Sequence, residues 1–455
     1  MNYDKIKRTG ILFLLGIGAI TSLSCNDNDN ANYPERVPTR LSVMPLPERV
    51  DYKESVVSLP QNVTVSQNIP ASTSQLLKST LEEKLSLSVS DASNDRAFIR
   101  VKQEADLAKE AYRLTVTKEG ACVYYSTETG LLWGIQTLRQ ALEQANFFTS
   151  GSAKYLPMVD IKDAPKYDWR GFHIDVVHMF TVDYLKKVID CLSFYKINKL
   201  HLHLTDDQGW RIEVKKYPLL TQEGSWRDFD EYDKRCVELS QQDYNYEIDP
   251  RFVRNGSQYG GHYTQEEMKG LVSYALERGI DIVPEIDMPG HFSAAIKVYP
   301  ELSCTGEAGW GEEFSYPICP SRPENYQFVQ SIIDEMVEIF PSEYFHIGAD
   351  EVEKDNWEQC EVCQRLMQQE GYQKVDELQN RFVKIMTNYV KGKGKKVMGW
   401  DDAFLEKEPQ DLIYTYWRDW LPDQPGKITQ KGYPIIFMEW SRFYLSATPS
   451  DEGLS

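Results

Sequence analysis

KLHLHLTDDQGWR, at residues 199–211, joins a short β-rich run to a cluster of polar and aromatic side chains. Lys199–Leu204 predicts a strand, and the acidic pair Asp206-Asp207 follows directly where that strand ends. Runs of the same kind recur along the rest of the chain, at Gly171–Val176, Asp281–Ile286, Tyr344–Ile347, Lys396–Gly399, Ile413–Trp417 and Ile435–Met438. The seven runs together decide the fold class.

Amphipathic helical segments alternate with these runs. The clearest are Val182–Tyr195, Thr264–Arg278, Tyr326–Phe340 and Val375–Lys391. Regular strand-then-helix alternation implies a parallel sheet with right-handed crossovers. Seven units favour an α/β (β/α)8 TIM barrel over an open doubly wound sheet, and no Gly-rich phosphate loop follows the first strand. Because the chain ends at Ser455, we expect this barrel to lack its last strand and helix.

A smaller domain of different pattern precedes the barrel. Tyr112–Val116 alternates as a strand does, whereas Ser72–Leu87 and Thr129–Leu142 have helical spacing. We therefore expect an α+β domain at residues 41–165, followed by the catalytic barrel at residues 166–455.

The N-terminus predicts export. Basic residues precede the apolar run Ile11–Leu23, which is too short to span a bilayer and matches the core of a signal peptide at residues 1–24. Small residues and Cys25 follow, which resembles a bacterial lipoprotein signal, and residues 25–40 suit a tether. The prediction is an outer-membrane or cell-surface lipoprotein, held to the membrane only through lipid on Cys25. With Cys25 unmodified, the protein would instead be simply secreted or periplasmic.

Charge and composition narrow the partners. A net charge of −19 argues against nucleic acid, because phosphate binding needs clusters of Lys and Arg. The 27 Tyr and 10 Trp supply flat surfaces of the kind on which sugar rings stack.

The ends of the predicted strands carry the chemistry. In a barrel of this kind the catalytic groups lie at the C-terminal ends of the strands. The polar and aromatic residues there are Asp175, Asp206, Asp207, Glu285, Asp287, His291, Asp350, Glu351, Trp400, Asp401, Asp402, Trp417, Trp440 and Tyr444. Carboxylates, an imidazole and indoles around one cavity suit a glycosidase, which must protonate a leaving oxygen and stabilise an oxocarbenium-like state.

Four motifs in order resemble the family 20 glycoside hydrolases, which are β-N-acetylhexosaminidases. They are WRGFHID at 169–175, LHLTDDQGWR at 202–211, DMPGH at 287–291 and HIGADE at 346–351. The resemblance implies hydrolysis of terminal, non-reducing β-linked GlcNAc or GalNAc from an oligosaccharide or glycoconjugate, with no cofactor. It also implies retention of configuration by substrate assistance, in which the sugar's own acetamide attacks the anomeric carbon.

The same resemblance implies two catalytic roles. Glu351 would be the general acid/base, and Asp350 would orient the acetamide and stabilise its developing positive charge. His291, with Asp206 or Asp207, would lie next to Glu351 and hold it in place without contacting the substrate.

The remaining roles concern substrate binding. Tyr444 would hydrogen-bond the acetamide carbonyl, and Trp400 and Trp417 would enclose the acetyl methyl group. Arg170 would bind sugar hydroxyls, for which the fork of donors on a guanidinium is suited.

Two positions depart from the pattern, and the expected end of the barrel suggests another function. Ser446 stands where the family has the aspartate of Tyr-x-Asp, which suggests tolerance of a modified sugar such as a 6-sulfated one, or a local misalignment. His178 stands where relatives tend to carry arginine. Because the barrel is expected to be incomplete, the alternative function is a surface sugar-binding lipoprotein with little or no activity.

The cysteines beyond Cys25 predict structural thiols. Cys304 and Cys319 flank a loop and could pair in an oxidising compartment. Cys360 and Cys363 have metal-like spacing, but no second Cys/His pair is evident to complete a tetrahedral site. No metal is therefore expected, and no three-ligand set is evident that would suggest a metal hydrolase.

Overall fold

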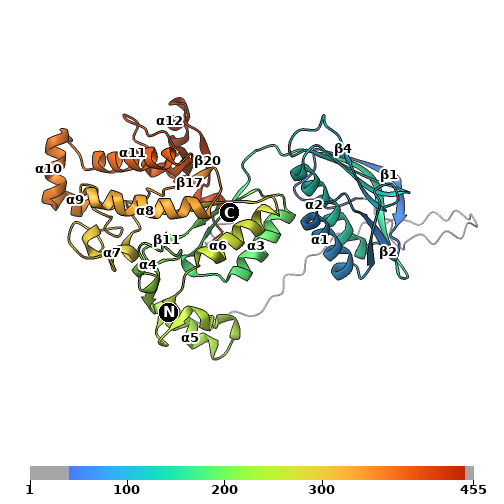
Figure 1. Cartoon of the computed structure of the whole chain (residues 1–455), viewed down its shortest axis with the longest axis horizontal. Helices are drawn as coiled ribbons and strands as arrows, with labels where there is room; N and C mark the ends of the chain where they lie inside the picture. The colour runs from blue at the N-terminus through green and yellow to red at the C-terminus, as the bar shows by residue number, and fades with distance from the viewer. Residues whose placement is uncertain (1–39, 446–455) are drawn as a thin grey trace, which may run out of the picture.

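A computed structural model describes residues 40–445, which form two lobes (Figure 1). The predicted signal peptide, Cys25, all but the last residue of the tether, and Ser446 lie outside the described residues. In the part of the chain from 40 to 445, no helix combines the length and apolar content needed to cross a bilayer.

The first lobe is a mixed eight-stranded sheet covered by helices. Its strand order is β1-β8-β5-β6-β4-β2-β3, with β7 paired to β8. The strands are β1 (Arg49–Ser58), β2 (Asn62–Ser66), β3 (Ser88–Ala92), β4 (Ile99–Gln103), β5 (Tyr112–Thr117), β6 (Gly120–Tyr125), β7 (Thr149–Ser150) and β8 (Ala153–Asp163).

Helices α1 (Ala71–Ser79) and α2 (Glu128–Gln144) supply the apolar cover of this sheet. The predicted helix at Ser72–Leu87 is confirmed in its first half, and the chain then widens into a π-helical turn at Thr80–Lys84. Alternate residues of β5 are buried, as the sequence pattern predicted for a half-buried strand.

The second lobe is built on a seven-stranded parallel sheet that follows chain order. All seven predicted strands are confirmed, as β9 (Gly171–Asp175), β10 (Lys199–His203), β16 (Asp281–Glu285), β17 (Tyr344–His346), β18 (Lys396–Trp400), β19 (Ile413–Tyr416) and β20 (Ile435–Phe437). Each strand pairs in parallel with the next, so the carboxyl ends of all seven meet at one rim. Within residues 40–445, no strand pairs with the outer edges of β9 and β20.

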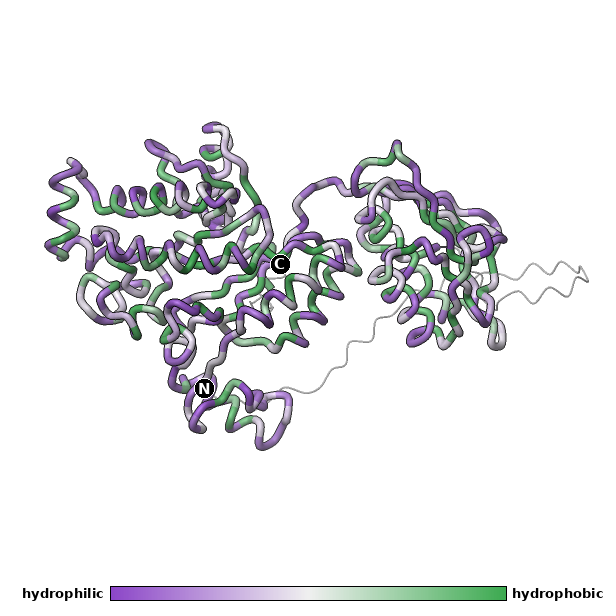
Figure 2. The backbone as a smooth tube through the Cα atoms, in the orientation of Figure 1, coloured by the Kyte–Doolittle hydropathy of each residue, from purple (hydrophilic) through white to green (hydrophobic). Residues whose placement is uncertain are grey.

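Helices connect the strands and shield the sheet. The four predicted helices are confirmed as α3 (Val182–Phe194), α6 (Gln265–Leu276), α8 (Pro323–Ile339) and α11 (Asp376–Gly392). Hydrophobic and hydrophilic residues alternate along each helix (Figure 2), as in amphipathic helices that pack one face on a core. Helix α8 begins three residues earlier than the apolar pattern indicated, because Pro323 occupies its first turn, where proline is favoured.

Shorter elements lie in the connections between these strands and helices, and the sequence pattern did not predict them. They are the strands β11 (Thr205–Asp206), β12 (Gly209–Trp210), β13 (Trp226–Asp228), β14 (Val253–Arg254) and β15 (Gln258–Gly260), and the helices α4 (Leu219–Gln222), α5 (Glu231–Ser240), α7 (Ser293–Ile296), α9 (Asp355–Gln359), α10 (Glu361–Glu370), α12 (Gln424–Gln430) and α13 (Trp440–Phe443).

Candidate active site

The loop after β17 presents the two acidic residues that the sequence singled out. Gly348, Ala349 and Glu351 all have positive φ, at 66°, 77° and 47°. A Cβ on Gly348 would lie 1.8 Å from Asp287 Oδ1, so only glycine fits there. That same oxygen accepts the backbone N–H of Ala349 at 3.0 Å. Non-glycine residues held at positive φ are typical of functional sites, where the surroundings offset the strain.

His291 connects Glu351 to a pair of half-buried aspartates. Its Nε2 lies 3.4 Å from Glu351 Oε2, and its Nδ1 lies 3.0 Å from Asp206 Oδ1 and 3.3 Å from Asp207 Oδ2. Both aspartates therefore face the imidazole. Burial opposes a charge on His291, but the hydrogen bonds to Asp206, Asp207 and Glu351 outweigh it and raise the pKa of the imidazole well above its usual value. His291 is thus a cation next to Glu351.

Asp350 lies next to the carboxyl group of Asp287. Burial, followed by the charge of Asp287, raises the pKa of Asp350 well above its usual range. Burial also raises the pKa of Asp287 to about 7. No described residue donates a hydrogen bond to the buried Oδ1 of Asp350. The two carboxyl groups therefore share a proton up to near neutral pH, and Asp287 Oδ2 and Asp350 Oδ1 have no other donor among the described residues.

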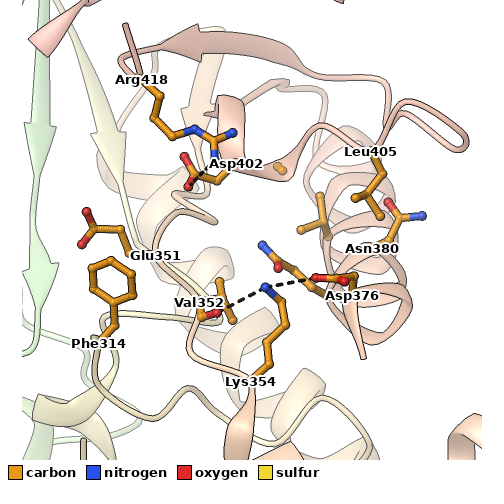
Figure 3. A pocket seen from close by; sticks show the side chains of 12 residues that line it. Phe314, Glu351, Val352, Lys354, Asp376, Asn380, Asp402, Leu405 and Arg418 are labelled. Carbon is orange, nitrogen blue, oxygen red and sulfur yellow. Dashed lines mark hydrogen bonds and ion pairs between the residues drawn. The ribbon is translucent and has the colours of Figure 1, made fainter. Parts of the chain in front are cut away.

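Glu351 borders a cavity of about 700 Å³ that is lined by both aromatic and charged side chains. Its aromatic side chains are Phe314, Trp417, Trp420 and Trp440. A second pocket adjoins it through shared residues, and there Phe314 lies beside Glu351 while Asp402 pairs with Arg418 (Figure 3). Glu351 thus opens onto a space large enough for a small ligand.

Asp402 and its neighbours orient Trp417. The indole Nε1 of Trp417 donates to Asp402 Oδ2 at 2.8 Å, and its backbone N–H donates to Asp401 at 3.1 Å. Arg418 pairs with Asp401 at 2.9 Å and with Asp402 at 3.2 Å. Burial raises the pKa of Asp402 to about 6 despite that arginine. Arg418 is not among the site residues predicted from the sequence.

Trp400 lies deeper, inside the barrel, and is held by Glu285. Its Nε1 donates to Glu285 Oε1 at 2.8 Å, and its ring packs 4.9 Å from that of His346. Trp400 is 4% exposed, and it does not line the two pockets that Glu351 borders. Its place is therefore beneath the rim.

Glu285 is the centre of a buried histidine cluster. Its carboxylate lies 2.8 Å from His201 and 3.1 Å from both His203 and His346. Burial opposes ionisation of Glu285, but His346, His203 and His201 outweigh it and lower the pKa of the carboxyl well below its usual value. The signal for this cluster was present in the sequence, since residues 201 and 203 alternate on one strand and point to the same face. The expectation that no three-ligand set exists is therefore wrong, because Glu285 groups with His201 and His346, and also with His173 and His203.

Tyr444 follows β20, the last strand of the described residues, and its phenol lies near the acidic side chains of the rim. Burial, followed by the charges of Asp350, Glu285, Glu351 and Asp402, raises the pKa of its phenol. Its hydroxyl therefore lies within the field of the acidic cluster and remains protonated, as a donor.

Arg170 does not lie in this pocket, contrary to what the resemblance implied. It precedes β9, so it sits at the opposite end of the barrel from the rim. Its guanidinium donates to the carbonyl oxygens of Lys196 and Tyr167 and pairs with Glu110 of the first lobe at 2.6 Å. The rim end of β9 carries His178 instead, 3.6 Å from Asp175.

Four cysteines gather beneath the loop that carries Phe314. Cys304, Cys319, Cys360 and Cys363 are free thiols whose sulfur atoms all lie within 4.8 Å of one another. The expectation that Cys360 and Cys363 lack a second pair is therefore wrong, because Cys304 and Cys319 are that pair. They are 41 or more residues away along the chain, and only the fold brings them close.

Comparisons with known proteins agree with this geometry. Residues 167–453 match the catalytic domain of glycosyl hydrolase family 20, and residues 40–164 match domain 2 of that family. A β-hexosaminidase of Porphyromonas gingivalis is 37% identical, over 69% of this chain and 38% of its own length. One of Vibrio furnissii is 34% identical, over 77% of this chain and 55% of its own. This chain thus spans only part of the length of these relatives.

Solved structures of related enzymes have the same fold as this chain. The GH20 exo β-N-acetylglucosaminidase of Vibrio harveyi, in complex with N-acetylglucosamine, superposes with a TM-score of 0.76 at 28% identity, over 90% of this chain and 63% of that one. The β-N-acetylhexosaminidase of Bacteroides fragilis gives 0.72 at 29% identity, over 90% of this chain and 78% of that one. Because the catalytic-domain match covers more than half of the sequence, this chain belongs to glycosyl hydrolase family 20.

Proposed function

We propose that this protein hydrolyses terminal, non-reducing β-linked N-acetylhexosamine from glycans, with retention and by substrate assistance. The observation that carries the proposal is the adjacency of Asp350 and Glu351 at the rim. His291 stands 3.4 Å behind Glu351, and a cavity lined in part by indoles lies in front of it. Of the related structures, one is an exo β-N-acetylglucosaminidase in complex with N-acetylglucosamine and another is a β-N-acetylhexosaminidase.

Glu351 is the proton donor and acceptor in the proposed reaction. The acetamide oxygen of the bound sugar attacks C1, the bond from C1 to the leaving oxygen breaks, and that oxygen takes the proton of Glu351. The Glu351 carboxylate then takes a proton from water, and the oxygen of this water opens the oxazolinium-like intermediate at C1. The charge of His291 stabilises the carboxylate form that Glu351 adopts between the two steps.

Asp350 and Tyr444 hold the acetamide in place. Asp350 would accept the N–H of the substrate acetamide, and this hydrogen bond would gain strength as positive charge develops on the acetamide. The protonated phenol of Tyr444 would donate to the acetamide oxygen, and Trp417 would flank the methyl group.

The first test compares Glu351→Gln with the intact chain on aryl β-N-acetylglucosaminide and aryl β-N-acetylgalactosaminide. Turnover should fall by about 10² to 10⁴, the usual worth of acid/base catalysis. Glu358→Gln, at an exposed position on α9, is the matched control and should retain activity. Unchanged turnover in Glu351→Gln would reject the assignment, and sugar binding without turnover by the intact chain would favour a binding protein.

The second test addresses substrate assistance. Asp350→Asn should slow cleavage by about 10² to 10³, the range for one preorganised polar contact in a transition state. The first sugar released should be the β-anomer by NMR, and the matching aryl β-glucoside, which lacks the acetamide, should not be cleaved. Release of the α-anomer, or equal cleavage of the glucoside, would contradict the mechanism.

We also propose that the protein is exported as a lipoprotein through Cys25. The support is the basic and apolar pattern of residues 1–24 followed by that cysteine. Metabolic labelling with a fatty acid should mark the full-length protein and not Cys25→Ala. Label in Cys25→Ala, or its absence from the intact protein, would refute it.

A further inference from the structure

The four gathered cysteines have the geometry of a mononuclear metal site. The sulfur of Cys363 lies 3.8 Å from that of Cys304 and 3.7 Å from that of Cys319, and Cys360 completes the group within 4.8 Å. With metal–sulfur bonds of about 2.3 Å, a regular zinc–thiolate tetrahedron places its sulfur atoms about 3.8 Å apart.

We propose that Cys304, Cys319, Cys360 and Cys363 bind one zinc ion as four thiolates. Zinc and iron both accept four sulfur ligands in a tetrahedron, and zinc needs no redox partner. Binding releases the four thiol protons to solvent and closes the coordination sphere, which makes the site structural rather than catalytic.

Disulfide bonding does not explain this arrangement. A disulfide would bring one pair of sulfur atoms to about 2 Å and leave the others apart. Here Cys363 is nearly equidistant from Cys304 and Cys319, and all four thiols are free. The four sulfur atoms surround one common point, as the four ligands of a tetrahedral metal ion do.

The surroundings fix the sulfur-bearing segments before any ion binds. The backbone N–H of Cys319 donates to Leu302 at 2.8 Å, and the indole of Trp357 donates to Ile318 at 3.2 Å. Cys319 and Cys363 are buried in a small apolar cluster with Trp357. Cys363 lies in the first turn of α10, and Cys360 directly precedes that helix. The ligands are thus held by packing and backbone hydrogen bonds, which lowers the cost of assembling the site.

The site joins two segments that flank the catalytic pocket. Between Cys304 and Cys319 runs the loop that carries Phe314, which lines the pocket, and Ser315, whose hydroxyl donates to Asp207 at 2.7 Å. Cys360 and Cys363 follow the acidic dyad by nine and twelve residues. A zinc ion would therefore clamp the Phe314 loop to the chain that leaves Glu351.

The test is the metal content of the full chain, purified without an affinity tag that binds metal. Inductively coupled plasma mass spectrometry should find about one zinc per chain and negligible iron, whereas Cys319→Ser and Cys363→Ser should retain less than about a tenth of that. Cys191→Ser, at an exposed cysteine outside the cluster, is the control and should keep its zinc. Cobalt-substituted protein should show the intense visible absorption of a tetrahedral thiolate site.

A thiol-protection experiment keeps the proposal testable if the variants do not fold. In the intact protein the four cysteines should resist alkylation until a mercurial reagent releases the zinc, while Cys191 reacts at once. Zinc-free protein with four reactive thiols, protein in which two of the four form a disulfide, or iron in place of zinc would each overturn the proposal.

Discussion

At the scale of single residues, the carboxyl groups around Glu351 differ sharply in protonation because their neighbours differ. Asp206 faces two histidines, and although its burial opposes ionisation, the hydrogen bonds from His203 and His291 lower the pKa of this carboxyl far below its usual value. Asp287 and Asp350 face each other, and burial raises the pKa of Asp287 to about 7. The site therefore holds anions on one side of Glu351 and a shared proton on the other.

The proton on the Asp287–Asp350 pair should make stability depend on pH in a defined direction. An unfolded aspartate has a pKa of about 4, so between pH ~4 and ~7 the folded chain retains a proton that the unfolded chain has lost. Wild-type stability should therefore fall as pH rises through that window. Asp287→Asn mimics the protonated form and should be stabilised relative to wild type at pH 8, by about 1–3 kcal/mol, with the difference vanishing near pH 4.

Thermal unfolding of both proteins at several pH values measures this. Asp95→Asn, at an exposed aspartate of the first lobe, serves as the reference for a carboxylate lost without burial. A pH-independent difference between Asp287→Asn and wild type would show that the pair holds no extra proton.

At the scale of elements, the loop from β17 to Glu351 depends on one glycine. Gly348→Ala would place a methyl group on Asp287 Oδ1, the oxygen that accepts the Ala349 N–H. The loop must move to relieve the clash, so we expect loss of most activity and a destabilisation of about 2–5 kcal/mol. Gly394→Ala has a similar positive φ but no neighbour within 4 Å, so it should cost only about 1 kcal/mol and leave turnover unchanged. Equal effects of the two changes would mean that backbone strain alone, rather than the contact with Asp287, constrains the loop.

The elements themselves were largely predictable, and the rim was less so. The seven barrel strands and four long helices follow from local periodicity, which is a property of a single segment. The short pieces between residues 205 and 263 lack such a period. The four-cysteine group depends on contacts between distant segments, which no local pattern encodes. Of the Glu285 cluster, only the alternation of His201 and His203 on one strand is local. Arg170 shows the converse error: the resemblance placed it among the sugar-binding residues, although strand β9 separates it from the rim by the depth of the barrel.

At the scale of the whole molecule, the two lobes meet through buried polar contacts at the base of the barrel. Gln136 of α2 donates to Ser193 of α3 at 2.8 Å, and Lys196 contacts Tyr112 at 3.0 Å and Asp163 at 3.3 Å. Arg170 adds its ion pair with Glu110, which also accepts the indole N–H of Trp133. These contacts lie at the end of the barrel opposite the rim that carries Asp350 and Glu351, so the first lobe supports the barrel from its base.

This arrangement separates stability from catalysis, and Arg170→Met tests the separation. The ion pair is mostly buried, with 14% and 17% of its two side chains exposed, so its loss should cost about 1–3 kcal/mol in thermal or denaturant unfolding. If Arg170 instead bound sugar hydroxyls, losing its charge-assisted hydrogen bonds would lower kcat/KM roughly 10- to 100-fold. We expect unchanged kcat/KM below the unfolding transition. Glu110→Gln should show the same loss of stability, and the double variant should lose less than the sum of the two, because each single change already breaks the same pair. Additive losses of stability would contradict the ion pair, and a fall in kcat/KM confined to Arg170→Met would indicate that Arg170 binds the substrate.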